Sequence, residues 1–310
     1  MSRSASLPRL NIHDQIAANR WRSFLLIALF VLFVVAVLEV IGLALGAPLP
    51  LAVVGLLIAL LSVGFSYYFS DSLVLGISQA RPVQKKDDAE LHNLVENLCL
   101  GAGLPLPRVY LIDDGAINAF ATGRNPQHAA LAVTRGARQR LSKLELEGVI
   151  AHELSHVRNF DIRTMAITAV LLGMVVIAAD LFLRWTWYGA GARGRYRGKG
   201  EGAGGAALLV IALVLAVLAP LVARLIQSAV SRQREYLADA SGALLTRYPE
   251  GLASALEKIA QDADPLDVAT KGTRHLFISD PFLRVNRSSL NNLFSTHPDI
   301  GDRIRRLRAM

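Results

Sequence analysis

The chain contains a single cysteine, Cys99, which excludes an internal disulfide and gives no sign of an oxidising compartment. We expect Cys99 to be a small buried apolar residue. Basic helices with interleaved aromatic residues are also missing, as is the cysteine and histidine spacing of a zinc knuckle. The net charge of +8 is spread along the chain, so nucleic acid is not an expected partner.

Hydrophobic residues are abundant instead: they make up 53% of the 310 residues, which is high for a soluble domain. Many of them fall into four long apolar runs, 24–46, 51–69, 165–183 and 206–226. About 20 consecutive apolar residues are enough to span the hydrocarbon core of a bilayer. The sequence therefore predicts a membrane protein, and basic residues gathered on its cytoplasmic side would account for the positive net charge.

The first two runs are separated by the short turn APLP, so we expect residues 22–70 to form a transmembrane hairpin after a polar segment, 1–21. A cleaved signal peptide is the weaker interpretation, because the polar leader and the first run are long and a second span follows directly. Basic residues flank the hairpin on both sides and are absent from its turn: Arg9, Arg20, Arg22, Arg81, Lys85 and Lys86. The positive-inside rule therefore places both ends of the hairpin in the cytoplasm.

Residues 71–164 and 230–310 are more polar, and we expect them to form two parts of one α+β domain, interrupted by a second hydrophobic hairpin over 165–229. The segment DDAELHNLVENLCLGAG predicts a helix, with Asp87 and Glu90 as a capping box. RVYLIDD (108–114) and HAALAVTRG (128–136) are strand-like, and INAFATG (117–123) lies between them. Ser142 and Glu145 can open a further helix.

That further helix would carry the segment VIAHELSHVRNFD, in which His152 and His156 are four positions apart. On an α-helix this spacing rotates the second side chain by about 40° and raises it by one turn, so both imidazoles emerge on one side. Neutral imidazole is a good ligand for Zn²⁺. Glu153 lies about 100° further round the helix, where its carboxylate can face a water on the same ion. The pattern is the H-E-x-x-H signature of a metalloprotease.

The alternative to a metal site is that the two histidines lie on an exposed helix face and that Glu153 is a solvated charge. An apolar stripe in the same segment argues against it, because this stripe would pack into a core while the histidines face elsewhere. The stripe consists of Leu146, Ile150, Leu154 and Val157. We therefore expect His152 and His156 to be metal ligands and Glu153 to be the catalytic base.

A catalytic zinc ion needs a third protein ligand and leaves its fourth position to water. The segment SRQREYLADASG (231–242) offers Glu235 and, one helical turn later, Asp239. Glu235 can be the third ligand of a single Zn²⁺ ion, and Asp239 can accept the free N–H of a ligand imidazole. Taken alone, the segment is equally typical of a surface helix with an Arg/Glu pair.

These ligands constrain the topology, because they lie on both sides of the second hydrophobic pair. The number of bilayer crossings between Phe160 and Ser231 must be even, since Glu235 could not otherwise reach the histidines. Two crossings place the linker 184–205 outside, although it is rich in arginine, contrary to the positive-inside preference. A shallow hairpin on the cytoplasmic side is the alternative, and we favour two crossings.

The combination of HELSH, a hydrophobic hairpin and SRQREYLADASGA resembles the HtpX-type membrane metalloproteases, whose wider family includes the CAAX prenyl proteases. The resemblance covers nearly the whole chain, including NAFATG and the final STHPDIGDRI. It implies an integral membrane protein, mainly α, in which an α+β zincin-type catalytic domain with a small sheet accompanies four hydrophobic helices. It also implies a multi-pass protein of the bacterial inner membrane, with a cytoplasmic catalytic domain that cleaves misfolded or damaged membrane proteins.

Four further residues follow from the resemblance. Asn118 and Ala119 match the edge strand on which such proteases hold an extended substrate by backbone hydrogen bonds, although a plain strand beside a turn would read the same way. His297 and Arg303 match the family's late His-Pro segment. There His297 would stabilise the oxyanion of the reaction, or would be a structural histidine fixed by its proline neighbour. The remaining histidines are expected at the surface: His13, His92, His128 and His275.

Three functions fit these residues. The favoured one is a zinc endopeptidase that acts on membrane proteins or unfolded polypeptides at the lipid bilayer. A prenyl-protein processing protease is less compatible with four hydrophobic segments and a chain of 310 residues. A non-catalytic zinc sensor or scaffold would have no need of Glu153 beside its ligands.

Overall fold

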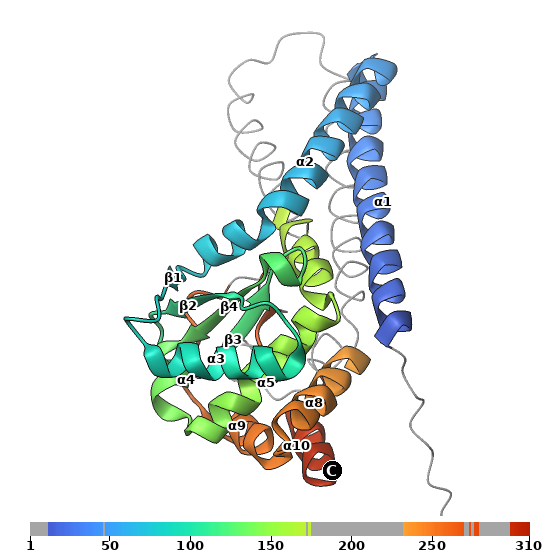
Figure 1. The fold of residues 1–310 in the computed structure, drawn as a ribbon. Coiled ribbons are helices and arrows are strands. Elements are labelled where there is room, and N and C mark those ends of the chain that lie inside the picture. The colour runs from blue at the N-terminus through green and yellow to red at the C-terminus, as the bar shows by residue number, and fades with distance from the viewer. Residues whose placement is uncertain are drawn as a thin grey trace, which may run out of the picture.

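The computed structural model describes residues 12–45, 47–171, 173–174, 232–269, 273, 276–278 and 298–310. Most of the second predicted hydrophobic hairpin, and its arginine-rich linker, lie outside these residues. The described elements form a long helical hairpin joined to a domain in which helices surround a small sheet (Figure 1). The expected mainly helical architecture with a small sheet is therefore present.

The hairpin consists of α1 (Ile12–Leu45) and α2 (Pro48–Ile77), which lie side by side (Figure 1). They approach closely at Gly55, where an added Cβ would lie 3.2 Å from Cβ of Leu38. Pro48 occupies the first turn of α2, where its missing N–H breaks no helical hydrogen bond. Both helices run past the predicted limits of 22 and 70, so helical turns extend beyond each apolar run.

Among the described residues, one helix is long and apolar enough to cross a bilayer, and it is α2, Pro48–Ile77. Helix α1 adds a shorter apolar stretch, Ser23–Glu39. The four predicted hydrophobic helices are therefore described in part: the third begins as the helical stretch 161–171, and the fourth lies outside the described residues.

The last turns of α2 fix the hairpin to the sheet. Val74 and Leu75 are buried in a cluster with side chains of one sheet face, including Phe120. Asp71 pairs with Arg108 at 2.5 Å, which adds a polar tie at the edge of this contact. Because α2 is continuous, its apolar part and the sheet form one connected unit.

In the part of the chain that the structure describes, the sheet has four strands in the order β1-β2-β4-β3. β2 (Arg108–Ile112) and β4 (Ala130–Thr134) are parallel neighbours in its centre. β3 (Ala119–Thr122) pairs antiparallel with β4 and forms one edge, as the sequence resemblance predicts. The other edge is β1 (Arg81–Pro82), which was not predicted because two residues carry no periodic signal.

Helices α3 (Ala89–Ala102) and α5 (Lys143–Arg158) bury their apolar sides in one cluster with the face of the sheet opposite the α2 contact. The start of α5 has the predicted capping box of Ser142 and Glu145. Asp88, rather than the predicted Asp87, caps α3, since its side chain accepts the N–H of Leu91. Cys99 is buried in α3, as expected. The remaining described elements are η1 (Pro126–His128), α4 (Arg135–Arg140), α8 (Arg232–Thr246), α9 (Pro249–Gln261) and α10 (Ile300–Arg308).

Helix α5 ends abruptly before the third apolar run. Asn159 forms its C-cap, and Phe160 has a left-handed backbone with φ of 59°. A new helical stretch begins at Asp161. The chain therefore turns between the H-E-x-x-H helix and the residues that lead toward the predicted membrane segment.

We expect Gly148→Ala to destabilise the protein, because Gly148 is where α5 meets α9 without a side chain between them. An added Cβ would lie 2.6 Å from the backbone nitrogen of Leu252, so the helices would have to separate. The expected loss is about 1–3 kcal/mol in the free energy of unfolding. Gly101→Ala is the matched control: its Cβ would meet only a leucine methyl at 3.4 Å, and it should be neutral or stabilising. Denaturant unfolding of both variants in detergent micelles checks this.

Candidate metal centre

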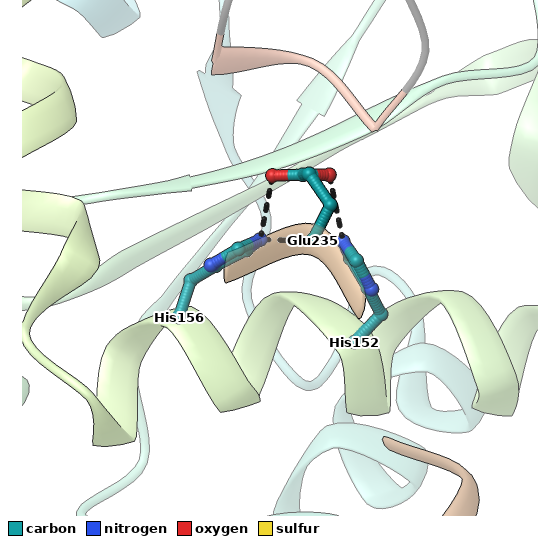
Figure 2. A group of neighbouring side chains, drawn as sticks. All are labelled: His152, His156 and Glu235. Atoms are coloured by element: carbon teal, nitrogen blue, oxygen red, sulfur yellow. Dashed lines mark hydrogen bonds and ion pairs between the residues drawn. The ribbon is translucent and has the colours of Figure 1, made fainter. Parts of the chain in front are cut away.

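Two helices bring together the three residues that the sequence proposes as metal ligands. His152 and His156 come from α5, and Glu235 comes from the first turn of α8. Figure 2 shows both imidazoles rising from the same side of α5 toward the carboxylate of Glu235. All three side chains are buried, and one potential ligand atom from each lies within 4.8 Å of the others. The i, i+4 spacing therefore places both imidazoles on one side of α5, as helical geometry predicts.

The distances within this group are short. The two imidazole Nε2 atoms are 3.2 Å apart. Glu235 Oε2 lies 3.8 Å from Nε2 of His152, and Oε1 lies 3.6 Å from Nε2 of His156. Helix α8 can come this close because Gly242 faces α5: an added Cβ would lie 3.0 Å from the backbone nitrogen of His152.

Each histidine has a carboxylate on its other ring nitrogen. Nδ1 of His152 lies 2.9 Å from Oδ1 of Asp239, the residue that the sequence suggests as an acceptor for an imidazole N–H. Nδ1 of His156 lies 3.1 Å from Oδ2 of Asp161. A carboxylate at Nδ1 favours the proton on that nitrogen and leaves the lone pair of Nε2 directed into the site.

Sequence reasoning missed Asp161. It follows His156 by five positions, which on a continuous helix would place it on a different side from the imidazole. The left-handed turn at Phe160 breaks the helix and returns Asp161 to the ring of His156. A helix-ending Asn-Phe pair directly before an aspartate is the available signal, and it is weak.

The charged groups at the site perturb one another strongly. Burial lowers the pKa of His152. Burial also acts to lower the pKa of His156, but its hydrogen bond to Asp161 and the charge of Glu235 outweigh this and raise the pKa to about 9. In the metal-free protein the site therefore favours a positive charge at His156, which is the electrostatic character of a cation site.

Glu153 lies on the side of α5 that faces the sheet edge. Its Oε2 accepts the backbone N–H of Ala121 in β3 at 2.9 Å. Burial, with the nearby charge of Glu235, raises the pKa of Glu153 to about 8. In the metal-free protein this carboxyl group therefore holds its proton more tightly than an exposed glutamate does.

Arg303 of α10 lies behind the ligands and is almost completely buried. Its guanidinium donates two hydrogen bonds to the carboxylate of Asp239, from Nε at 2.8 Å and from Nη2 at 2.7 Å. Nη1 lies 3.7 Å from Oε2 of Glu235. The structure therefore places Arg303 beside Glu235 and Asp239. His297 lies outside the described residues, and its predicted role is a proposal.

The two residues predicted to hold substrate on β3 face different ways. The backbone of Asn118 faces β4: its N–H donates to Oγ1 of Thr134, and its carbonyl accepts the N–H of Thr134. This differs from the expectation, because alternate residues of a strand direct their backbone groups to opposite sides. Ala119 is the one whose backbone N–H and carbonyl face outward, toward Asn118 Oδ1 and the N–H of Ile278.

Among the histidines whose side chains the structure describes, His92 and His128 take no part in this group. His92 is half-buried, with Nε2 2.7 Å from the carbonyl of Val83, which differs from the surface position expected for it. His128 is exposed, as expected. The side chain of His13 and all of His275 lie outside the described residues.

We expect Arg303→Gln to lower the free energy of unfolding by about 3–5 kcal/mol, because it leaves the buried carboxylate of Asp239 without its charged partner. The matched control is Arg305→Gln on the same helix, whose side chain is 72% exposed. This control should change stability by less than about 0.5 kcal/mol. Denaturant unfolding in detergent micelles measures both, and equal effects would show that the buried pair does not support the site.

Comparisons with known proteins show the family to which the chain belongs. Residues 85–310 match the model of the peptidase family M48. A protease HtpX homologue of Dictyoglomus thermophilum is 43% identical over 303 residues, covering 96% of this chain and 94% of the relative. One of Tropheryma whipplei is 44% identical over 302 residues, covering 96% and 98%. The crystal structure of S. mikatae Ste24p aligns with a TM-score of 0.49 and 19% identity, over 89% of this chain and 62% of that chain. The chain belongs to the peptidase family M48.

Proposed function

We propose that this protein is a membrane-bound zinc metalloendopeptidase of EC class 3.4.24. In this proposal His152, His156 and Glu235 hold one Zn²⁺ ion, and Glu153 is the catalytic base. The observation that carries the proposal is the buried convergence of two imidazoles and one carboxylate, with ligand atoms within 4.8 Å of one another.

The donor set fits zinc. Two nitrogens bound to one tetrahedral Zn²⁺ ion at about 2.0–2.1 Å are separated by about 3.3 Å, and the two Nε2 atoms are 3.2 Å apart. Among the described residues the group has three members, which is the number of protein ligands in a catalytic zinc site. A structural site would need a fourth.

When bound, zinc lowers the pKa of a coordinated water toward neutrality and polarises the scissile carbonyl. The protein's own residues then handle the protons. Glu153 takes a proton from the attacking water and gives it to the amide nitrogen as the peptide bond breaks. Its hydrogen bond from Ala121 holds the carboxylate in one orientation between α5 and β3. Asp161 holds the N–H of His156 on Nδ1, and Asp239, 2.9 Å from Nδ1 of His152, favours the same tautomer there, so that each Nε2 is available as a ligand.

The hairpin supports a location in a membrane. The apolar 18-residue window of α2 is only 17% buried within the protein, so most of its side chains would otherwise face water. Exposed large residues line this helix, among them Leu56, Leu57, Leu60 and Leu61. We place the hairpin in a bacterial inner membrane, with the catalytic domain in the cytoplasm according to the flanking basic residues.

The same reasoning extends to the segments outside the described residues. Because α5 and α8 meet at one site, the chain between them crosses the bilayer an even number of times. With the hairpin, two further crossings would give a multi-pass protein. The docking of α2 on the sheet holds the site next to the membrane, so we propose that the substrates are extramembrane segments of misfolded or damaged membrane proteins.

Glu153→Gln should abolish peptidase activity while leaving the zinc content unchanged, because the ligands remain and only the base is lost. We expect a fall in kcat of at least about a thousandfold. Glu147→Gln, the same substitution on the same helix away from the site, should keep full activity. The assay follows cleavage of an unfolded polypeptide by detergent-solubilised protein that has been stripped with chelator and reloaded with zinc.

Equal activity of wild type and Glu153→Gln would contradict an enzymatic role for this site. Preferential cleavage of a farnesylated peptide over the unfolded polypeptide would instead support prenyl-protein processing. The comparison of variants tests whether the site is catalytic, and the comparison of substrates tests which peptides are cleaved, so one set of assays separates the three functions.

Asp161→Asn should weaken zinc binding about 10- to 100-fold, because Asn holds the imidazole N–H of His156 less strongly than a carboxylate does. Asp267→Asn is the control, since Asp267 is exposed and away from the ligands. Competition with a zinc-binding dye measures both affinities. An unchanged affinity for Asp161→Asn would show that Asp161 does not support the ligand.

A further inference from the structure

The outer side of the edge strand β3 is already occupied by a short segment of the same chain, residues 276–278. The N–H of Ile278 donates to the carbonyl of Ala119 at 3.1 Å. Leu276, Phe277 and Ile278 are all buried. This edge is where the proposed function places an extended substrate, so the inference below rests on that function.

The two last residues of this segment are arranged as in an added strand. Phe277 belongs to the cluster on the α2 face of the sheet and meets the ring of Phe120 edge-on, with centroids 5.2 Å apart. Ile278 belongs to the cluster on the opposite face, beneath α5. Successive side chains of a strand point to opposite faces of a sheet, and Phe277 and Ile278 do so at the edge of β3.

Three outward backbone groups of β3, on Ala119 and Ala121, have partners within the chain. The carbonyl of Ala119 accepts from Ile278, and the N–H of Ala119 donates to Oδ1 of Asn118 at 3.0 Å. The N–H of Ala121 donates to Glu153. A substrate that adds to a sheet edge binds through such backbone groups. It therefore cannot pair with the carbonyl of Ala119 in register while Ile278 remains there.

The segment is also tied to the metal centre. The carbonyl of Ile278 accepts a hydrogen bond from Nη1 of Arg303 at 2.9 Å. The same guanidinium holds Asp239, which in turn lies against His152. One buried side chain therefore connects the occupied sheet edge to a proposed zinc ligand.

We propose that residues 276–278 form an autoinhibitory strap, which occupies the edge of β3 and is displaced by the substrate strand. Release exposes the side chains of Phe277 and Ile278, so an incoming segment must replace their apolar contacts as well as the hydrogen bond to Ala119. The strap therefore selects extended segments with large apolar side chains at neighbouring positions. Membrane proteins that have lost their native packing present such segments.

The proposal predicts that a weaker strap gives a more active enzyme. Phe277→Ala removes the contact with Phe120 but keeps the N–H of Ile278. We expect kcat/KM for reduced, carboxymethylated lactalbumin to rise about threefold to tenfold, mainly through KM, because a larger fraction of the protein has an open edge. Leu266→Ala is the control: it truncates a buried residue of the same cluster that is not part of the strap, and it should not raise activity.

Unchanged or reduced kcat/KM in zinc-loaded Phe277→Ala, with an active wild type, would overturn the strap and leave the proposed function intact. A wild type without zinc-dependent cleavage would overturn the proposed function and the strap with it.

Hydrogen exchange gives a second test that does not depend on variants of the strap. Zinc-loaded Glu153→Gln in detergent is compared with and without an excess of the same polypeptide. Exchange of the amides at 277 and 278 should become faster on binding, while the central strand β4 stays protected. Unchanged or slower exchange at 277 and 278, with binding shown by fluorescence anisotropy of labelled polypeptide, would overturn the strap.

Discussion

The close packing of α5 against α8 is the constraint on which the site depends. It sets a buried carboxylate, Glu235, against two buried imidazoles, and charges removed from water are tolerated only when they are paired or bind a cation. The surrounding groups meet this requirement in pairs: Asp239 with Arg303, and Asp161 with Arg234 at 3.4 Å. The metal centre is therefore the middle of a buried ionic network that also joins α10 to the two helices.

The sheet connects this network to the hairpin. One of its faces packs beneath α5, and the other packs against the last turns of α2. Because the sheet packs on both faces, a single continuous helix and the strands it contacts connect the apolar hairpin to the proposed active site. Under the proposed function, this arrangement favours substrate segments close to the membrane surface.

Sequence periodicity predicted the parts of the site that follow from a regular helix. The i, i+4 spacing placed His152 and His156 on one side, and the capping box marked the start of their helix. The sequence did not predict the contact between Asp161 and His156, because it depends on a left-handed residue at 160. It also did not predict that residues 276–278 lie on the edge of β3, because pairing between distant segments leaves no local sequence pattern. Asn118 was expected to offer its backbone to substrate, but strand alternation turns it toward β4. The observed helix cap also differs from the predicted one at α3, where Asp88 takes the place of Asp87, because neighbouring aspartates are equally good caps.

Gly242 is a residue outside the proposed ligand set on which the geometry of that set depends. A methyl group at this position would touch the main chain of α5 and act as a wedge between the two helices. The carboxylate of Glu235 would then move away from the two imidazoles with α8, although all three proposed ligands were still present. Inactive relatives of such enzymes can therefore arise by substitutions at helix contacts, and a surviving H-E-x-x-H motif alone is not proof of a working centre.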